Sequence, residues 1–197
     1  MKKKIVIGIS GGIASGKSLV SEYIKNKGYK IYDCDSLAHE IFEFQDTKEK
    51  IASAFNIDIK DVNRKYISKL VFNNNKLLES LNDIMKNKII SQMKEIINNN
   101  NGFIFFDAPL IYDWHLEDMF DRVIFVYVNK NIQELRLSQR DNIDLEYAKK
   151  KINSQIDIDE KYQLAKSRKD YIVDNNGTID ALNPQIDEIL KEIENEI

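Results

Sequence analysis

The residues with the clearest chemistry in this 197-residue chain form one glycine-rich run. Residues 11–18 read Gly-Gly-Ile-Ala-Ser-Gly-Lys-Ser and match the phosphate-binding pattern G-x-x-x-x-G-K-[ST]. In this pattern the backbone N–H groups surround the phosphates, Lys17 adds positive charge to the outer ones, and the Ser18 hydroxyl binds Mg²⁺. We expect a nucleoside triphosphate to be held by nine consecutive residues: Gly11, Gly12, Ile13, Ala14, Ser15, Gly16, Lys17, Ser18 and Leu19.

The segments on both sides of this run are those that a phosphate-binding loop requires. Residues Ile5–Ser10 form a short, apolar and largely β-branched run, which is typical of a buried parallel strand. In the segment after the loop, Val20, Tyr23 and Ile24 fall on one face of a helix. The order strand, glycine loop, helix places a partial positive charge at the loop and favours a phosphate site over a chance glycine-rich turn.

Acidic residues follow two further predicted strands. Asp33 and Asp35 come directly after the strand Lys30–Tyr32, and the carboxyl ends of strands line the ligand crevice of an open α/β sheet. We therefore expect Asp33 to face the terminal phosphate and to orient an attacking hydroxyl, and Asp35 to contact Mg²⁺ through water or to hold substrate. The alternative is that either carboxylate only caps the helix that begins near Ser36.

A third acid and a group of arginines complete the predicted chemistry. Asp107 follows the apolar strand Phe103–Phe106, which is the Walker B pattern that can place a carboxylate beside a metal ion. Arg136, Arg140 and Arg168 lie in a polar, helical region and are candidates for neutralising charge on a migrating phosphoryl group. The alternative for each arginine is a solvated surface charge.

The overall composition is that of a soluble globular protein. The net charge of −3 creates no general attraction to nucleic acid or to an acidic membrane surface, so we expect neither as a partner. The single cysteine, Cys34, excludes an internal disulfide and a cysteine-based zinc site. The first apolar run is too short for a signal peptide and no segment reaches the length of a membrane span, so we expect a cytoplasmic protein.

The pattern of short apolar runs and helical stretches predicts an α/β fold. The predicted strands are Ile5–Ser10, Lys30–Tyr32, Phe103–Phe106, Arg122–Val128 and Tyr171–Val173. Because helical stretches separate them, we expect a five-stranded parallel sheet flanked by helices on both faces, with the phosphate loop of the P-loop NTPases.

The length of two connections predicts additional parts within a single domain of residues 1–197. Residues 37–101 form a mostly helical excursion that is far longer than a crossover needs, so we interpret it as a substrate-binding cap. Residues 137–168 are charged and have few apolar positions, which favours a mobile lid. The predicted core comprises the remaining ranges, about 1–36, 102–136 and 169–197.

With these residues in place, the chain resembles the dephospho-CoA kinase family nearly end to end. Residues 9–18 are similar to that family's Thr-Gly-Gly-Ile-Gly-Ser-Gly-Lys-Ser signature, residues 32–35 to its Ile-Asp-Ala-Asp segment, and residues 107–113 to its Asp-x-Pro-Leu-Leu-Phe-Glu segment. Further similarities are Arg64 with the Val71-Phe72 pair, Gln139-Arg140, Gln155, Glu160-Lys161, and the Asp174-Asn175-x-Gly177 ending. The chain departs from the family at Ala14 and Leu19, and it lacks a His-Pro pair near Asp83-Ile84.

The resemblance implies transfer of the ATP γ-phosphate, with Mg²⁺, to the ribose 3′-hydroxyl of dephospho-CoA. It implies catalytic roles for Lys17, Asp33 and Arg140, with Arg140 also binding ATP, and metal binding by Ser18 and Asp107. The implied substrate-binding residues are Asp33, Asp35, Arg64, Asp107, Pro109 and Leu110. We expect a small-molecule substrate and a monomer or weak homo-oligomer.

Three other functions are compatible with a phosphate loop. One is another P-loop kinase, acting on a nucleoside monophosphate or shikimate. The second is a GTP-dependent switch, which the sequence disfavours because Ile132 stands where the guanine-reading pattern Asn-Lys-x-Asp has its carboxylate. The third is an inactive scaffold, although no residue of the phosphate site is missing.

Overall fold

A computed structural model describes residues 4–72 and 74–195, so the ends of the predicted core, residues 1–3 and 196–197, lie outside the described part. The chain divides into two compact units. We call residues 1–32 and 100–197 the sheet unit, and residues 33–99 the helical unit. Each is described by itself.

The strands form a five-stranded parallel sheet, as the sequence predicts, and the structure shows that their order is β2-β3-β1-β4-β5. Their bounds are β1 (Ile5–Gly11), β2 (Ile31–Asp33), β3 (Phe103–Asp107), β4 (Arg122–Tyr127) and β5 (Tyr171–Asp174), each within one residue or so of its predicted range. Strand β1 is the central strand and every one of its residues is buried, which explains its largely apolar character. The phosphate-binding loop therefore leaves the most enclosed strand of the sheet.

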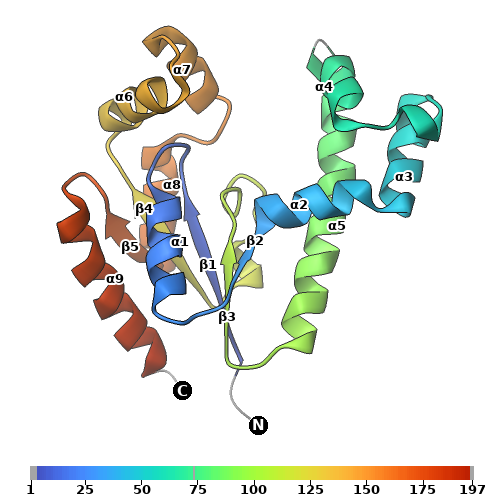
Figure 1. The fold of residues 1–197 in the computed structure, drawn as a ribbon. Coiled ribbons are helices and arrows are strands. Elements are labelled where there is room, and N and C mark those ends of the chain that lie inside the picture. Colours follow the sequence, from blue (N-terminus) through green and yellow to red (C-terminus); the bar gives the residue numbers. More distant parts are fainter. Residues whose placement is uncertain (1–3, 73, 196–197) are drawn as a thin grey trace. The chain divides into compact units, whose positions relative to one another are not determined.

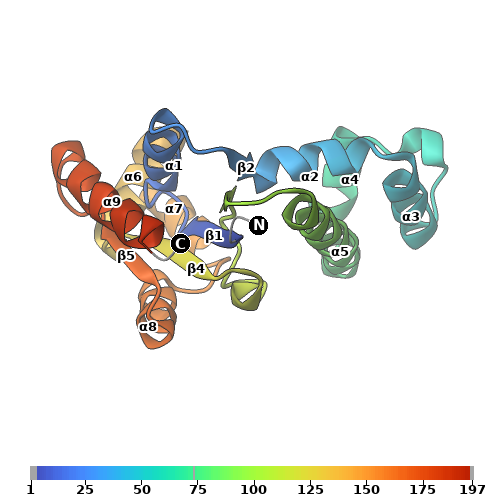
Figure 2. The same cartoon turned by 90° about the horizontal axis from the view of Figure 1, so that it is seen from below.

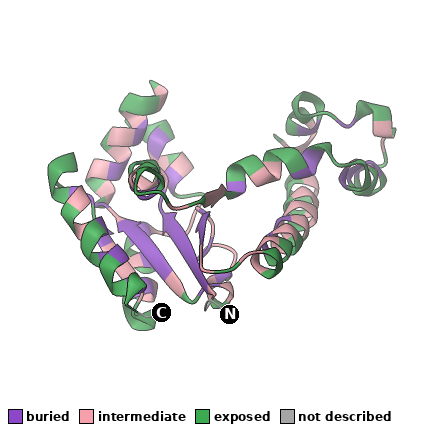
Figure 3. Cartoon of the chain, turned by 60° about the horizontal axis from the view of Figure 1, so that its bottom comes forward, coloured by how far each residue is buried: buried purple, intermediate pink, exposed green. Residues whose placement is uncertain are grey.

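Helices cover both faces of the sheet (Figures 1 and 2). On one face, Ile5, Ile7 and Ile9 of β1 pack with α1 (Lys17–Asn26) and α9 (Ile179–Glu194) in the main hydrophobic core. On the other face, α8 (Ile158–Arg168) contacts β4 and β5. Figure 3 shows the result, with buried strands and helices whose outward faces are exposed.

Helices α6 (Lys130–Asp141) and α7 (Leu145–Ile152) form a hairpin in the sheet unit. They pack on each other through Leu137, Ala148 and Ile152, which are buried. The predicted lid, residues 137–168, also contains α8, but this helix is part of the packed unit, because Lys161 and Ala165 are fully buried. The first part of that range lies in the α6–α7 hairpin, which begins at Lys130, before the predicted lid, and does not cover the sheet (Figure 1).

The helical unit has a hydrophobic core of its own. Its elements are α2 (Cys34–Glu43), α3 (Gln45–Phe55), the short 3-10 helix η1 (Ile59–Asp61), α4 (Arg64–Phe72) and α5 (Asn75–Asn99). Buried Phe42, Ile51, Phe55 and Ile67 pack together with half-buried residues of α5. No helix in the ranges 4–72 and 74–195 is long and apolar enough to cross a membrane, α5 included.

Candidate active site

The phosphate-binding loop is built by backbone turns and is closed on one side by Asn175. Gly16 has φ +90° and is the N-cap of α1, a left-handed conformation that glycine adopts without steric cost. A side chain at Gly16 would collide with Asn175, whose Nδ2 donates to the Ser15 carbonyl at 2.7 Å. Asn175 is 3% exposed and follows β5, so the end of that strand supports the loop.

The residues of the loop differ in their exposure to solvent. Gly11, Gly12 and Ser15 are buried, whereas Ser18 and Leu19 are exposed. An exposed hydroxyl on Ser18 is free of competing packing and can reach a solvated cation. The loop therefore offers backbone N–H groups and one hydroxyl at the N-terminus of α1, where the helix dipole favours negative charge.

Lys17 and Asp107, which the sequence predicts to share a site, are in contact. Lys17 Nζ forms an ion pair with Asp107 Oδ1, and the Ser21 hydroxyl donates to Asp107 Oδ2 at 2.6 Å. The Lys17 and Asp107 side chains are 17% and 12% exposed, so the pair is largely shielded from water. A phosphate bound in the loop must compete with Asp107 for this lysine.

Ser21 also belongs to this site, although it is not part of any of the sequence motifs. It lies four residues after Lys17 on α1, and this spacing puts both side chains on the same face of the helix. A small polar residue on the buried face of an amphipathic helix is the signal that points to it, since such a hydroxyl needs a partner. The partner, Asp107, is known only from the fold.

Pro109 and Leu110 continue from Asp107 along the edge of the sheet unit. Ser10 at the end of β1 donates its hydroxyl to the Pro109 carbonyl at 3.3 Å, and Leu110 accepts the backbone N–H of Trp114. Both Pro109 and Leu110 are half-buried. The segment is therefore fixed to β1 near the start of the phosphate loop.

The three candidate arginines differ in their surroundings. Arg140, at the end of α6, is 58% exposed and donates Nε to Asp141 Oδ1 at 2.9 Å. Arg136 lies one turn earlier and is half-buried. Arg168 instead donates to the Asp118 carboxylate and to the Glu117 carbonyl, at 3.1 and 3.2 Å, so it anchors the end of α8. Arg140 is thus exposed on the α6–α7 hairpin, whereas Arg168 is hydrogen-bonded at the end of α8.

In the helical unit, Asp33 is a helix cap. It is the last residue of β2 and its Oδ1 accepts the backbone N–H groups of Asp35 and Ser36 at 2.8 and 2.9 Å. The capping alternative for Asp33 is thus realised. Both hydrogen bonds go to Oδ1, so Oδ2 is not used by the cap, and the residue is exposed.

A groove of about 500 Å³ in the helical unit brings together two predicted substrate residues, Asp35 and Arg64. Arg64 is oriented by donation from Nη2 to the His39 carbonyl at 2.8 Å, and its guanidinium lies 5.5 Å from the centre of the Phe42 ring. Ala38 and Met85 complete the lining. The groove thus combines a cation, a carboxylate and apolar surface, which suits a ligand with a phosphate and an uncharged portion.

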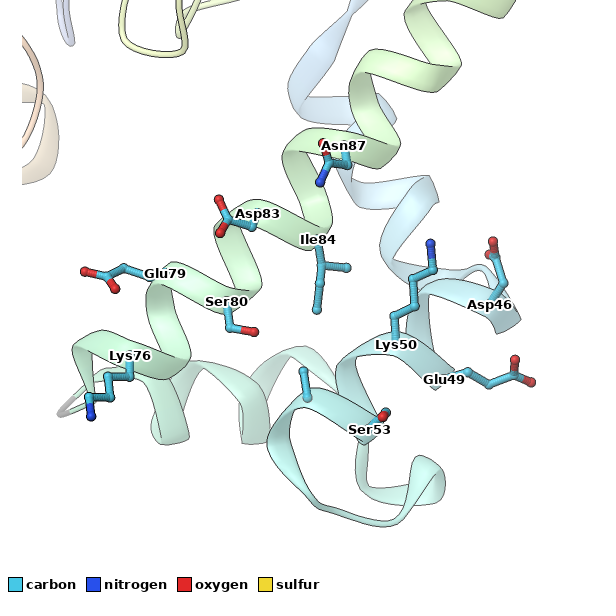
Figure 4. Close-up of a pocket in the computed structure, with 11 residues that line it drawn as sticks. Asp46, Glu49, Lys50, Ser53, Lys76, Glu79, Ser80, Asp83, Ile84 and Asn87 are labelled. Carbon is cyan, nitrogen blue, oxygen red and sulfur yellow. The ribbon is translucent and has the colours of Figure 1, made fainter.

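A larger groove of about 830 Å³ lies between α3 and α5 of the same unit. Figure 4 shows that charged side chains dominate it, among them Lys50 from α3 and Glu79 and Asp83 from α5. None of the predicted site residues lines it. It does contain Asp83 and Ile84, the positions at which the sequence lacks the family's His-Pro pair.

The chain matches known proteins along most of its length. The dephospho-CoA kinase family model matches residues 5–181. A dephospho-CoA kinase of Fusobacterium nucleatum is 35% identical over 194 residues, covering 96% of this chain and 98% of that protein.

Solved structures are also similar to this chain. The dephospho-CoA kinase from Campylobacter jejuni is 30% identical, with a TM-score of 0.62 and coverage of 96% of this chain and 97% of that one. TT1252 from Thermus thermophilus, at 23% identity, shares the fold with a TM-score of 0.80 and coverage of 97% and 98%. A family match over most of the chain, together with a relative of this identity and coverage, shows that the chain belongs to the dephospho-CoA kinase family.

Proposed function

We propose that this chain transfers the γ-phosphate of ATP to the 3′-hydroxyl of the ribose of dephospho-CoA, producing CoA and ADP. The observation that carries the proposal is the Lys17–Asp107 pair beside a complete phosphate-binding loop, in a chain of the dephospho-CoA kinase family. In the transfer, a bond forms between the hydroxyl oxygen and the γ-phosphorus, and the bond between that phosphorus and the β-phosphate oxygen breaks.

Lys17 and Asp33 have distinct roles in this proposal. Lys17 exchanges its partner Asp107 for the β- and γ-phosphates and offsets their charge. Asp33 accepts the proton of the substrate hydroxyl on Oδ2, the oxygen that the helix cap does not use. Because phosphoryl transfer has a loose transition state, orienting the hydroxyl matters more than strong basicity of this carboxylate.

The residues present also fit a bound Mg²⁺ ion. Mg²⁺ is usually held by one or two protein oxygens together with substrate phosphates and water, and here the exposed Ser18 hydroxyl and the Asp107 carboxylate supply such oxygens. When bound, the ion would neutralise part of the negative charge of the phosphates. Asp107 would be able to hold such an ion once Lys17 pairs with the nucleotide instead.

The remaining predicted residues are assigned to substrate and to closure. We assign Asp35 and Arg64, which share a groove in the helical unit, to the binding of dephospho-CoA. Pro109 and Leu110 of the sheet unit are assigned the same role. Arg140 contacts ATP when the α6–α7 hairpin closes as a lid, and closure excludes the water that competes as phosphoryl acceptor. We expect the enzyme to act in the cytoplasm, as a monomer or weak homo-oligomer.

The test is an ADP-release assay with ATP, Mg²⁺ and dephospho-CoA, with mass spectrometry of the product. Shikimate and AMP serve as competing acceptors, GTP as competing donor, and the Lys17→Met variant as the control for the loop. We expect phosphorylation of dephospho-CoA, strongly reduced in Lys17→Met. Preferential phosphorylation of shikimate or AMP, or GTP binding without transfer, would overturn the proposal.

A further inference from the structure

Both stems of the α6–α7 hairpin are hydrogen-bonded to one residue of the phosphate loop, Ile13. Gln133, in the first turns of α6, donates Nε2 to the Ile13 carbonyl at 2.8 Å. Gln155, which follows α7, accepts the Ile13 backbone N–H on Oε1 at 3.3 Å. The peptide groups on both sides of Ile13 are therefore held by the hairpin, one from the start of α6 and the other from the segment after α7.

The surroundings of Gln133 allow its side chain to reach the phosphate loop. Gln133 is 2% exposed, so its amide is shielded from water that could compete for the Ile13 carbonyl. The neighbouring Gly12 has no side chain, and a Cβ there would lie 2.6 Å from Gln133 Nε2 and 2.9 Å from Ile158 Cδ1. Glycine at position 12 thus makes room for the glutamine.

Ala14, the next residue, is in a conformation that needs support. Its φ of +57° is left-handed, which costs a non-glycine residue roughly 1–2 kcal/mol. The side chains of Ile13 and Ala14 pack against the buried Leu137, Ala148 and Ile152 of the hairpin. The hairpin therefore contacts this part of the loop through apolar packing as well as through the two glutamines.

We propose that Gln133 and Gln155 are positioning residues that hold the Ile13–Ala14 turn in its phosphate-binding shape and couple it to the α6–α7 hairpin. Without them, the turn can leave the left-handed conformation, and the backbone N–H groups of the loop no longer converge on the phosphates. The coupling is reciprocal, so a bound triphosphate also stabilises the hairpin. The inference rests on the proposed function in taking ATP as the nucleotide. It does not depend on dephospho-CoA being the phosphate acceptor.

The experiment compares Gln133→Met and Gln155→Met with the matched control Gln163→Met, a change at an exposed glutamine of α8. The dissociation constants of ATP and AMP are measured by calorimetry without acceptor, and kcat and KM with dephospho-CoA. Loss of one hydrogen bond should weaken ATP binding about five- to tenfold, with AMP binding and the KM for dephospho-CoA changed less. The control should bind ATP like the unmodified chain.

A rescue variant separates positioning from general damage. Ala14→Gly, added to either methionine variant, removes the steric cost of the left-handed turn and should restore most of the ATP affinity. Gln155 is half-buried, so its variant tests the inference even if the buried Gln133→Met does not fold. Unchanged ATP affinity in a folded Gln155→Met chain, or no rescue by Ala14→Gly, would overturn the inference. Since binding is measured without acceptor, a chain that fails to phosphorylate dephospho-CoA leaves this test intact.

Discussion

At the scale of single residues, one carboxylate combines a structural and a proposed chemical role. Asp33 ends β2 and caps α2 with Oδ1, which fixes the orientation of the carboxyl group. A fixed carboxylate is what a positioning base requires, because a mobile one loses the geometry needed to orient a hydroxyl. Capping and catalysis are therefore compatible at Asp33, although the sequence presents them as alternatives.

The substitution Asp33→Asn separates these two roles. Asparagine is as good an N-cap as aspartate, so we expect thermal stability and ATP affinity to change little. It cannot accept the proton of the substrate hydroxyl, so we expect kcat to fall by about 10²-fold or more. The measurements are ADP release at saturating substrates, calorimetric ATP binding and the melting temperature. Unchanged turnover would remove Asp33 from the proposed mechanism.

At the scale of elements, the α6–α7 hairpin is held together by charge as well as by its apolar contacts. Asp141, at the end of α6, accepts hydrogen bonds from Arg140 at 2.9 Å and from Lys151 of α7 at 2.9 Å. These two cations lower the pKa of the Asp141 carboxyl to about 2, from an ordinary value of 3.8. The lid proposed above therefore has an ion pair between its helices, beside its candidate catalytic arginine.

This arrangement makes a prediction about pH. Because the folded-state pKa is lowered, the ion pairs contribute fully above pH 3.8 and are lost as the pH falls toward about 2. A carbon-13 NMR titration should show Asp141 as the low-pKa carboxyl of the hairpin. Lys151→Met should move its pKa up toward 3.8, while the control Lys149→Met, whose partner is Glu146, should not. An Asp141 carboxyl with an ordinary pKa in the unmodified chain would contradict the prediction.

At the scale of the whole molecule, a buried ion pair joins parts of the sheet unit that are distant in sequence. Lys161 of α8 is fully buried and lies 2.6 Å from Asp113 Oδ2, in the segment that follows β3. The other oxygen, Asp113 Oδ1, accepts the backbone N–H of Ile156 at 2.9 Å. The pair fixes α8 and the end of the hairpin to the segment that carries Pro109 and Leu110.

Breaking this pair on one side should destabilise the fold strongly. Lys161→Met leaves the Asp113 carboxylate buried without its cation, so we expect a loss of about 3–5 kcal/mol in the free energy of unfolding. Adding Asp113→Asn removes that charge and keeps an acceptor for Ile156, and it should recover most of the loss. Urea unfolding measures both variants, with the exposed Lys166→Met as a control expected to change stability by less than about 0.5 kcal/mol. Equal stability of the single and double variants would contradict the prediction.

The sequence by itself determined the features whose causes are local. The strand bounds follow from short apolar runs, and the phosphate loop follows from glycines between a buried strand and an amphipathic helix. The same local patterns predict the helices of residues 33–99, and the family follows from motifs spread along the chain. Each of these depends on residues that are near one another in the sequence.

The tertiary structure alone decided which side chains meet. Ser21 and Asp107 are 86 residues apart, Ile13 and Gln155 are 142 apart, and no periodicity relates the members of such pairs. The packing of α8 could not be predicted from the sequence either, because most of its residues are polar and one of its buried residues, Lys161, has its partner in another segment. Hydrogen bonds and ion pairs between distant segments depend on the order of strands and the packing of helices, which is a property of the folded chain.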